Sequence, residues 1–378
     1  MSEKKRVAIF LGGYLPAKKY GGPVTSVSNL VEQIGDQLEF YIISNDHEFG
    51  DHDRLPNIKN GWNSVGKAQV LYISEKEYTT HIFSVILQDI NADVIYLSSV
   101  FYYRMNFAAI KAAKKNKIPV ILAPRGEICE GAMEIGRIKK ELFISLIKIT
   151  KVFKDIYFHV TSDEEESAVI QYFNPDDDKI IKLPNMPCSL KKGKKIHKEK
   201  GCLSIVYLSR IVEKKNLLYA IQRVKECNQK ISMDIYGPLE DENYWEKCKE
   251  EFEDKQENIN IQYLGAIDPG DARNIFSNYH AFLFPTLSEN YGHVIVEAIT
   301  TSCPIIISKG TTPWDDINNQ GGFVIDLQNI EPWAKAIDRI AEMDGKEYDL
   351  LREKTYDYAK RKLNITELSK KYSEMFAT

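Results

Sequence analysis

Apolar runs alternate with amphipathic stretches along most of the chain, which is the pattern of strands followed by helices. In the first half the runs that predict strands are short, and several, such as RVAIFL, are apolar on both faces: 6–11, 38–43, 69–73, 93–97, 119–123 and 156–161. Such runs are typical of parallel strands that helices cover on both sides. Between the first two strands, Pro23 and Gly35 bracket a stretch whose apolar residues share one helical face, so a helix is predicted there.

The same pattern restarts after residues 191–200, KKGKKIHKEK, which hold six lysines. A stretch of this composition cannot fold by itself, so it predicts an exposed linker. Beyond it, six further runs predict strands: 203–208, 231–236, 259–263, 280–284, 304–307 and 322–325. Two such arrays predict an α/β protein with two domains, each a doubly wound parallel sheet.

The length of 378 residues favours two or three domains, at about 150 residues per domain. We expect an N-terminal Rossmann-like domain over 1–190, the linker over 191–200 and a C-terminal Rossmann-like domain over 201–346. The tail, 347–378, reads as helices that could pack back on the first domain. Ligands of such sheets bind beyond the carboxyl ends of the strands, and two facing domains would bring those ends to one central cleft.

Composition excludes several classes of protein. Hydrophobic residues make up 43% of the chain and charged residues 28%, which excludes a disordered chain, a collagen-like repeat and a coiled coil. The net charge of −4 argues against a nucleic-acid binder, since such proteins are usually far more basic. The six cysteines include no C-x-x-C pair, which predicts neither a disulfide framework nor a zinc site and fits a reducing cytoplasm. The N-terminus reads as a first strand rather than a signal peptide.

The segment PTLSENYGHVIVEAITTSCP carries two carboxylates eight positions apart, Glu289 in a loop and Glu297 in the helix that follows. Gly292 at the helix start lets the backbone approach a ligand, and the N–H groups of a helix N-terminus suit an anion such as a diphosphate. Both carboxylates can accept hydrogen bonds from sugar hydroxyls. The alternative is a surface loop residue and a solvated helix residue, but the apolar neighbours of Glu297 argue against an idle charge.

Two other loops carry candidate chemistry. Arg210 and Lys215 lie in YLSRIVEKKNL, after the first strand of the second array, and two cations there suit a diphosphate leaving group. Gly21 and Gly22 lie in LGGYLPAKKYGGPVTSV, where glycines at a helix start would let backbone N–H groups face a phosphate. The spacing is not the G-x-G-x-x-G dinucleotide fingerprint. A solvated charged loop and a flexible glycine loop are the respective alternatives.

These motifs together resemble the retaining GT-B glycosyltransferases of family 4. The E-x7-E element with ENYG is in place, SRIVEKKNL is similar to the family's G-R-L-x-x-x-K-G loop, and the Gly-Gly loop is similar to its P-x-x-G-G motif. YLPAKKYGGPVTSVSNLV, ILAPRGEICEGAM and HVTSDEEES also resemble a bacterial branch of polysaccharide and lipopolysaccharide assembly enzymes. The resemblance covers almost the whole chain. It implies two Rossmann-like domains that face a central cleft. It also implies metal-independent sugar transfer, with retention, from a nucleoside-diphosphate donor, and a UDP-sugar is the first candidate for that donor.

The resemblance also implies a role for each matching residue. Arg210 and Lys215 match the diphosphate-binding pair, Glu289 matches the glutamate at the donor sugar, and Glu297 matches the glutamate at the ribose. Backbone at the helix start, in the Gly-Gly loop and beside the nucleotide base would complete the donor site: Asn290, Tyr291, Gly292, Gly21, Gly22, Gly237 and Leu264.

The chain departs from the family's pattern at a few positions. Ser209 and Asn216 stand where the family often has glycine, before the Arg and after the Lys. Arg125 stands where many relatives carry a histidine, and a permanent cation cannot be a general base. We therefore expect Arg125 to bind phosphate or acceptor, with a structural ion pair as the alternative. His293, next to the helix start, either touches the donor or is a surface histidine.

Two further segments bear on metals and membranes. Asp51 and Asp53 form a D-x-D sequence, which holds a metal in glycosyltransferases of another fold, but it lies in a polar loop with no sign of that fold. We expect no metal and no cofactor besides the donor. Residues 136–155 are amphipathic and basic, which suits an anionic membrane surface or a lipid-linked acceptor, or else an ordinary packed helix with its lysines outward.

The sequence therefore predicts a glycosyltransferase of cell-surface polysaccharide synthesis, cytoplasmic or peripheral at the inner membrane face. Its partners would be a nucleotide-sugar donor and a saccharide or lipid-linked saccharide acceptor. Two alternatives stay open. A GT-B sugar-nucleotide epimerase would share the nucleotide site, and a non-catalytic sugar-nucleotide-binding assembly partner would share the fold, although intact Arg210, Lys215, Glu289 and Glu297 argue against the latter.

Overall fold

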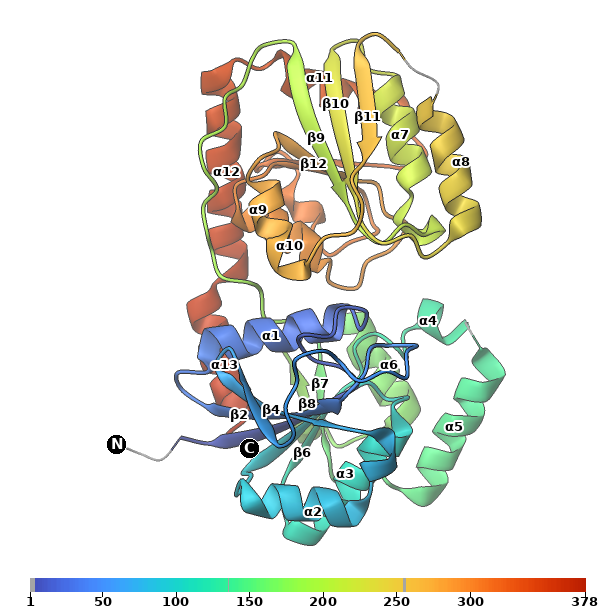
Figure 1. Ribbon diagram of the computed structural model, residues 1–378, viewed down its shortest axis with the longest axis vertical. Coiled ribbons are helices and arrows are strands. Elements are labelled where there is room, and N and C mark those ends of the chain that lie inside the picture. The colour runs from blue at the N-terminus through green and yellow to red at the C-terminus, as the bar shows by residue number, and fades with distance from the viewer. Residues whose placement is uncertain (1–3, 135, 254–255) are drawn as a thin grey trace. The chain divides into compact units, whose positions relative to one another are not determined.

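The computed structural model describes residues 4–134, 136–253 and 256–378, which form two compact units (Figure 1). Unit 1 comprises Met1–Pro187 together with Ile365–Thr378, and unit 2 comprises Cys188–Asn364. Each unit is a mostly parallel sheet with helices packed against it. The predicted fold class, two doubly wound α/β domains, is confirmed.

The sheet of unit 1 has eight strands in the order β3-β4-β2-β1-β5-β6-β7-β8, parallel except for β3, which runs antiparallel to β4. The strands are β1 (Arg6–Leu11), β2 (Glu39–Asn45), β3 (Trp62–Val65), β4 (Ala68–Ile73), β5 (Val94–Ser98), β6 (Val120–Ala123), β7 (Tyr157–Val160) and β8 (Ile180–Lys182). The sequence predicted six of them. It missed the two edge strands because β3 is short and polar, and β8 has only three residues.

Helices cover both faces of this sheet, so its strands alternate between two cores. In β1, Ala8 and Phe10 point to one core, while Val7, Ile9 and Leu11 point to the other. The first core is closed by α2, α3, α5 and α6, and the second by α1 and α13. The helices are α1 (Gly22–Ile34), α2 (Thr80–Asp89), α3 (Tyr103–Asn116), α4 (Glu130–Glu134), α5 (Arg137–Thr150), α6 (Asp163–Phe173) and α13 (Ile365–Met375).

The sheet of unit 2 has six parallel strands in the order β11-β10-β9-β12-β13-β14, and the sequence predicted all six. They are β9 (Cys202–Leu208), β10 (Lys230–Tyr236), β11 (Ile259–Tyr263), β12 (Ala281–Phe284), β13 (Ile305–Ser308) and β14 (Gly322–Ile325). The helices of this unit are α7 (Leu217–Lys225), α8 (Glu242–Glu253), α9 (Ala272–Phe276), α10 (His293–Thr300), α11 (Glu331–Glu342) and α12 (Gly345–Leu363).

Strand order reverses once in each sheet. In unit 2 the chain moves outward from β9 through β10 to β11 and then returns to place β12 on the other side of β9. In unit 1, β2 and β5 flank β1 in the same way. Crevices form at such reversals because the two loops leave the sheet in opposite directions, and ligands of open α/β sheets bind there. The fold thus singles out the loops after β9 and β12, and those after β1 and β5.

The C-terminal tail is divided between the units, whereas the sequence predicts that residues 347–378 as a whole could pack back on the first domain. Helix α12 belongs to unit 2, where Tyr348 donates to the carbonyl of His280 at 3.0 Å and Arg352 donates to the carbonyl of Lys194 at 2.6 Å. Helix α13 belongs to unit 1, where Tyr372 and Phe376 are buried in the second core. The change of unit falls between Asn364 and Ile365.

The lysine-rich stretch 191–200 is mostly exposed, as its composition predicts, but it belongs to unit 2 and is held there by specific hydrogen bonds. The backbone N–H of Gly193 donates to the carbonyl of Thr301 at 3.0 Å. Lys198 is buried, and its ammonium donates to the carbonyls of Ala341 and Met343 at 2.7 and 3.0 Å. A lysine is stable in that place because the carbonyl groups at the end of α11 carry partial negative charge and need donors. Composition alone could not reveal these partners.

Candidate functional site

The loop after β9 brings two cations to the switch point of unit 2. Arg210 is more than half exposed, and its Nη1 lies 2.9 Å from the carboxylate of Glu240. Lys215 ends a single 3-10 turn, Glu213–Lys215, and its side chain is only 11% exposed. One cation therefore faces solvent, where a ligand can displace its partner, and the other is held inside the loop.

Lys215 forms an ion pair with Glu289, in the loop after β12. Glu289 is also largely buried, with 14% of its side chain exposed, and its backbone N–H donates to the carbonyl of Thr311 at 2.7 Å. The Lys215 ammonium lies 5.7 Å from the centre of the Phe284 ring. Burial lowers the pKa of Lys215, while the negative charge of Glu289 opposes the shift. The sequence-predicted cation and carboxylate are thus in direct contact.

Asn216 explains how this chain keeps the loop without the family's glycine. Its φ of 58° lies in the left-handed region, which asparagine tolerates better than most residues other than glycine. Its side-chain amide donates to the carbonyl of Pro285 at 2.9 Å, at the end of β12. The substitution therefore preserves the turn and adds a second link between the loops that carry Lys215 and Glu289.

The start of α10 is shaped by Gly292, whose φ is 74°. Its carbonyl accepts from Ile295 and Val296, so the first N–H groups of the helix point out of its N-terminal end. Next to it, the carbonyl of Tyr291 accepts a hydrogen bond of 2.6 Å from the Trp314 indole, and burial raises the pKa of the Tyr291 phenol. The loop is therefore held by a hydrogen bond beside the N-terminal end of α10, whose open N–H groups suit an anion.

The remaining residues predicted around this helix start lie on either side of Tyr291. Asn290 is exposed, and the His293 ring lies 4.8 Å from the Tyr291 ring, centre to centre. Asn290 and His293 follow β12, so they lie at the same edge of the sheet as Lys215, which follows β9.

Glu297 lies just over one turn into α10, partly exposed among apolar residues. Within residues 4–134, 136–253 and 256–378, no group donates a hydrogen bond to its carboxyl. Burial raises the pKa of Glu297 to about 8, and the positive charge of Arg273 opposes that shift. A carboxyl group held without a partner is costly, which favours a role in binding.

Gly237 and Leu264 follow β10 and β11 at the same edge of the sheet. Gly237 has a φ of 142°, and a Cβ there would lie 1.7 Å from the carbonyl oxygen of Ser209. Its N–H donates to Gly265 at 2.9 Å, and Leu264 is 45% exposed. Only glycine permits this close approach of the loops after β9 and β10.

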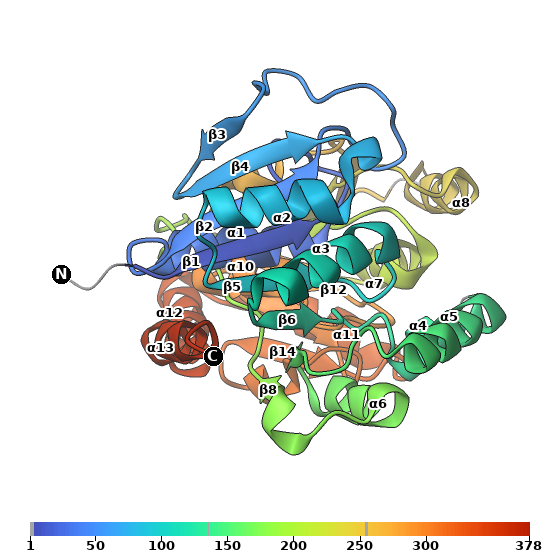
Figure 2. The same cartoon turned by 90° about the horizontal axis from the view of Figure 1, so that it is seen from below.

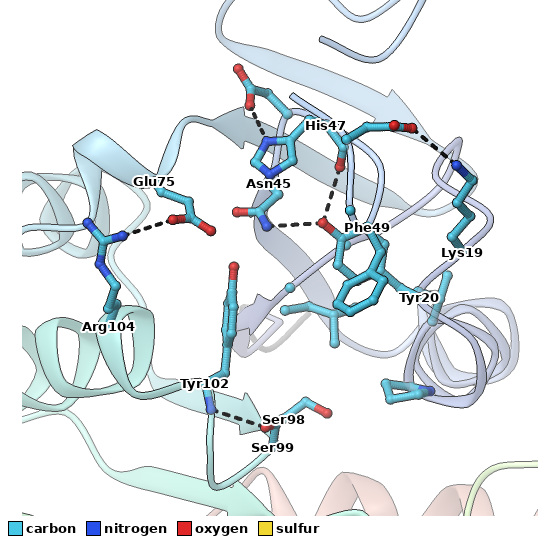
Figure 3. A pocket seen from close by; sticks show the side chains of 18 of the residues that line it. Lys19, Tyr20, Asn45, His47, Phe49, Glu75, Ser98, Ser99, Tyr102 and Arg104 are labelled. Carbon is cyan, nitrogen blue, oxygen red and sulfur yellow. Dashed lines mark hydrogen bonds and ion pairs between the residues drawn. The ribbon is translucent and has the colours of Figure 1, made fainter. Parts of the chain in front are cut away.

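Unit 1 contains a pocket of about 1020 Å³ at the carboxyl ends of β1, β2, β4 and β5 (Figure 3). Asn45 and Ser98 line it, are almost fully buried, and have no partner among the described residues for Asn45 Oδ1 and Ser98 Oγ. Tyr20 donates to the carbonyl of His47 at 3.2 Å and accepts from the Asn45 amide at 3.1 Å. The amide is thereby oriented, and its oxygen is left for a ligand.

Aromatic rings and balanced charges complete the wall of this pocket. Tyr20, Phe49 and Tyr102 line it, and Phe49 is 67% exposed (Figure 3). Lys19 pairs with Asp51 at 3.2 Å and Arg104 with Glu75 at 2.9 Å. Because cations and carboxylates neutralise each other, the pocket offers hydrogen bonds and flat apolar surfaces rather than net charge. Sequence reasoning missed Asn45 and Ser98; their only signal is their position where strands end.

Three residues predicted to face phosphate lie in unit 1. Gly21, with a φ of 68°, precedes α1, and Gly22 is its first residue; both are exposed. Arg125 donates to the amide oxygen of Asn185 and, at 2.8 Å, to the hydroxyl of Tyr96. Two of its N–H groups are therefore used inside unit 1, and Arg125 does not line the pocket of Figure 3. That Gly21 and Gly22 approach a diphosphate stays a prediction.

The Arg125 network also settles the state of a buried histidine. Tyr96 and His159 are fully buried, and Tyr96 Oη lies 2.7 Å from His159 Nδ1. His159 Nε2 donates to the carbonyl of Leu183 at 3.0 Å, so Nδ1 accepts from Tyr96. Burial lowers the pKa of His159 to about 3, and the nearby Arg125 cation adds to the shift. His159 is therefore a neutral core residue.

No group of three or more His, Cys, Asp or Glu residues in the described part of the chain is placed to hold a metal ion. Asp51, in the D-x-D sequence, is paired with Lys19. The same residues contain no helix that is both long and apolar enough to cross a bilayer.

The two units have the architecture of the GT-B glycosyltransferase fold. The chain superposes on HepE of Anabaena, solved with UDP and glucose, with a TM-score of 0.71 and 11% identity over 99% of each chain. It superposes on sucrose-phosphate synthase of Thermosynechococcus elongatus with a TM-score of 0.67 and 13% identity over 99% of this chain and 98% of that one. Likeness at such identities shows the fold.

The sequence of unit 2 is similar to that of known glycosyl transferases. Residues 191–362 match the family model of the glycosyl transferases group 1, which leaves out only a few residues of the unit. The chain is also 27% identical over 140 residues to the capsular polysaccharide biosynthesis glycosyltransferase CapM of Staphylococcus aureus. That match spans 36% of this chain and 36% of the relative. The loops after β9 and β12 lie within the residues that match this family model.

Proposed function

We propose that the protein transfers a sugar from a nucleoside-diphosphate donor to a saccharide or lipid-linked saccharide acceptor. A UDP-sugar is the first candidate for the donor. The observation that carries this proposal is the contact of Lys215 with Glu289 at the switch point of unit 2, with Arg210 in the same loop. Complexes of HepE with UDP and with UDP-glucose support a nucleotide-sugar donor for this fold. The match to CapM supports a place in polysaccharide biosynthesis.

The chemical task is to stabilise the diphosphate that leaves when the bond to the anomeric carbon breaks. Arg210 and Lys215 supply two positive charges, and the start of α10 at Gly292 supplies N–H groups aimed at developing negative charge. Because these groups are held in place before the reaction, little reorganisation is needed as charge develops. We therefore propose transfer without a metal.

The two carboxylates take different parts. Glu289 lies beside Lys215 and is assigned to the hydroxyls of the donor sugar, where its negative charge also faces the developing positive charge at the anomeric carbon. Glu297 lies further into α10 and is assigned to the ribose hydroxyls, because its carboxyl has no partner among the described residues. Gly237 and Leu264 provide backbone and an apolar edge for the base.

The unit 1 pocket is assigned to the acceptor. A saccharide has hydroxyl donors for Asn45 Oδ1 and Ser98 Oγ, and faces of C–H groups for Tyr20, Phe49 and Tyr102. The near balance of charge in the wall favours a neutral sugar at this position. A lipid-linked acceptor would place the reaction at the inner membrane face.

Retention means that the new bond from the anomeric carbon to the acceptor oxygen forms on the face that the diphosphate leaves. The hydroxyl proton then passes to the departing phosphate oxygen, so no protein base is needed. The family-4 assignment rests on the resemblance of the motifs. Nuclear magnetic resonance of the product linkage tests retention directly, because the anomeric configuration of donor and product must agree.

Product analysis with a radiolabelled UDP-sugar tests the proposal as a whole. A transferase yields UDP together with labelled acceptor. An epimerase yields UDP with an altered free sugar, and a binding protein yields neither. Arg210→Ala is the control, because it should abolish product without unfolding an exposed loop. Free altered sugar in the absence of labelled acceptor would replace the transferase by the epimerase.

A further inference from the structure

Helix α5 exposes an apolar stripe that the fold of unit 1 leaves uncovered. Ile138, Leu142, Leu146 and Ile149 recur at the spacing of one helical face, and they are 75%, 67%, 50% and 78% exposed. The opposite face is the packed one, with Ile144 and Ile147 buried in the core. Both views show α5 at the periphery of unit 1 (Figures 1 and 2). The sequence pattern of residues 136–155 thus resolves into two apolar faces, one inside and one outside.

Basic residues flank the exposed stripe. Arg137 and Lys148 lie on one side of it and Lys139 on the other, all exposed. The exposed part of the helix carries a single acidic residue, Glu141, which pairs with Arg137 at 2.8 Å. An aliphatic stripe with basic residues on both of its sides is the pattern of a helix that lies in the surface of an anionic bilayer.

The C-terminal end of α5 adds a second, independent feature. A pocket of about 360 Å³ opens there, lined by four lysines together with two acidic residues and an apolar floor. The lysines are Lys148, Lys151, Lys154 and Lys179, the acidic residues are Asp155 and Asp176, and the floor includes Ile147, Phe153, Ile156 and Phe173. The lysines outnumber the carboxylates two to one, so the pocket suits a phosphate group attached to an apolar chain.

The N-terminal end of α5 has the opposite character. A pocket of about 390 Å³ there is lined by Glu130, Glu134, Glu141 and Glu164, with Arg137 as its basic residue. An anionic surface would be repelled from this end and attracted to the other. The charges therefore fix an orientation, with the C-terminal half of α5 nearest to the lipid.

We propose that unit 1 docks on an anionic lipid bilayer through α5, with the aliphatic stripe in the interface and a lipid phosphate in the lysine pocket. A second protein copy is a poorer occupant, because protein interfaces are depleted in lysine and enriched in aromatic residues, whereas the exposed residues of α5 include Lys139 and Lys148 and no aromatic residue. The proposal deepens the function above only in naming where a lipid-linked acceptor would be met. Docking itself needs no sugar transfer.

Flotation of the full chain with vesicles tests this surface in the absence of any substrate, so the result is independent of the proposed activity. We expect binding to vesicles of equal parts phosphatidylglycerol and phosphatidylcholine, and loss of binding with phosphatidylcholine alone or at high salt. Leu142→Glu with Leu146→Glu should lower binding more than ten-fold. The matched control is Leu350→Glu on α12, since Leu350 is 58% exposed but has no such stripe. Circular dichroism and thermal unfolding check that each variant is folded.

Charge reversal tests the orientation. Lys148→Glu with Lys151→Glu should weaken binding by roughly five-fold or more for each lysine, whereas Arg137→Glu with Lys139→Glu should weaken it less. Equal loss from both pairs would overturn the lysine pocket. Wild-type protein that stays unbound, or that binds neutral and anionic vesicles alike, would overturn the proposal. So would a dimer in ultracentrifugation that Leu142→Glu dissociates, because the stripe would then be covered by a second copy.

Discussion

Replacing Lys215 with methionine should weaken UDP binding strongly while leaving the chain folded. Methionine keeps most of the length and the apolar stem of lysine, so the variant removes the positive charge and little else. In the structure the Lys215 side chain is 11% exposed, and its ammonium pairs with Glu289. A diphosphate that binds at this loop must therefore share or replace Glu289 as the partner of Lys215.

The expected magnitude follows from the kind of contact that is lost. A hydrogen bond to a charged group contributes about 1.5–3 kcal/mol, which corresponds to a loss of roughly 10- to 150-fold in affinity. Competition from Glu289 in the free protein should place the effect toward the lower end of this range. The Glu289→Gln variant isolates that competition. It should bind UDP at least as tightly as the wild type, but it should bind the UDP-sugar less tightly because the sugar contact is weakened.

Isothermal titration calorimetry of UDP against these variants is the measurement. Lys214→Met is the matched control, because Lys214 belongs to the same 3-10 turn but is exposed, and its ammonium forms no ion pair with a carboxylate of the described residues. Its effect should stay within about two-fold, as for a rim charge. Equal losses for Lys214→Met and Lys215→Met would mean that the loop attracts UDP by its overall charge. No loss in either would refute the diphosphate assignment.

Three further outcomes follow from the same site. In steady-state kinetics with the donor varied, Glu289→Gln should lower kcat and kcat/KM together, whereas Glu297→Gln should mainly raise the donor KM; the reverse pattern would exchange the two roles. Because burial raises the pKa of Glu297 to about 8, its carboxyl is mostly protonated at pH 7 in the free chain, and ribose hydroxyls that donate to the carboxylate would lower this pKa. UDP binding should then release a proton and tighten as pH rises from 6 to 8. Calorimetry in buffers of different ionisation enthalpy measures this proton release. The Glu297→Gln variant should release no proton when it binds UDP. Activity should survive EDTA. If EDTA abolishes activity and Mg²⁺ or Mn²⁺ restores it, transfer depends on a metal, and Asp51 becomes the candidate ligand.

The pattern of apolar runs was sufficient for the fold because central parallel strands are apolar on both faces. Twelve strands could be predicted on that basis, and the two that were missed lie at sheet edges, where solvent replaces one neighbour and the apolar signal weakens. The lysine-rich stretch shows the complementary limit. Its composition indicates exposure, yet Lys198 is buried because carbonyls at the end of α11 satisfy its ammonium. Such partners lie far away in the sequence, so the residues around Lys198 contain no pattern that predicts them.

The same reasoning separates what could be predicted in the candidate sites. Arg210, Lys215 and Glu289 follow strands and are charged, so position and chemistry both identify them. Their direct pairing could not be predicted, since it depends on which strands become neighbours. Asn45 and Ser98 are the last residues of β2 and β5, but neutral polar residues are common at such positions. They are identified as candidate binding groups only because Asn45 Oδ1 and Ser98 Oγ are buried without a hydrogen-bond partner among the described residues. That can be seen only in the folded chain.

The two units hold polar groups at the same point of the same fold, but in different electrostatic states. In unit 2 a lysine and a glutamate form a largely buried ion pair, and a ligand that carries charge of its own can take the place of one partner. In unit 1 the charged side chains pair off around the rim, and the buried groups left open are the neutral oxygens of Asn45 and Ser98. A diphosphate needs cations fixed in advance, whereas neutral hydroxyls need acceptors that have already been desolvated and oriented. This difference supports assigning the donor to unit 2 and a neutral sugar acceptor to unit 1.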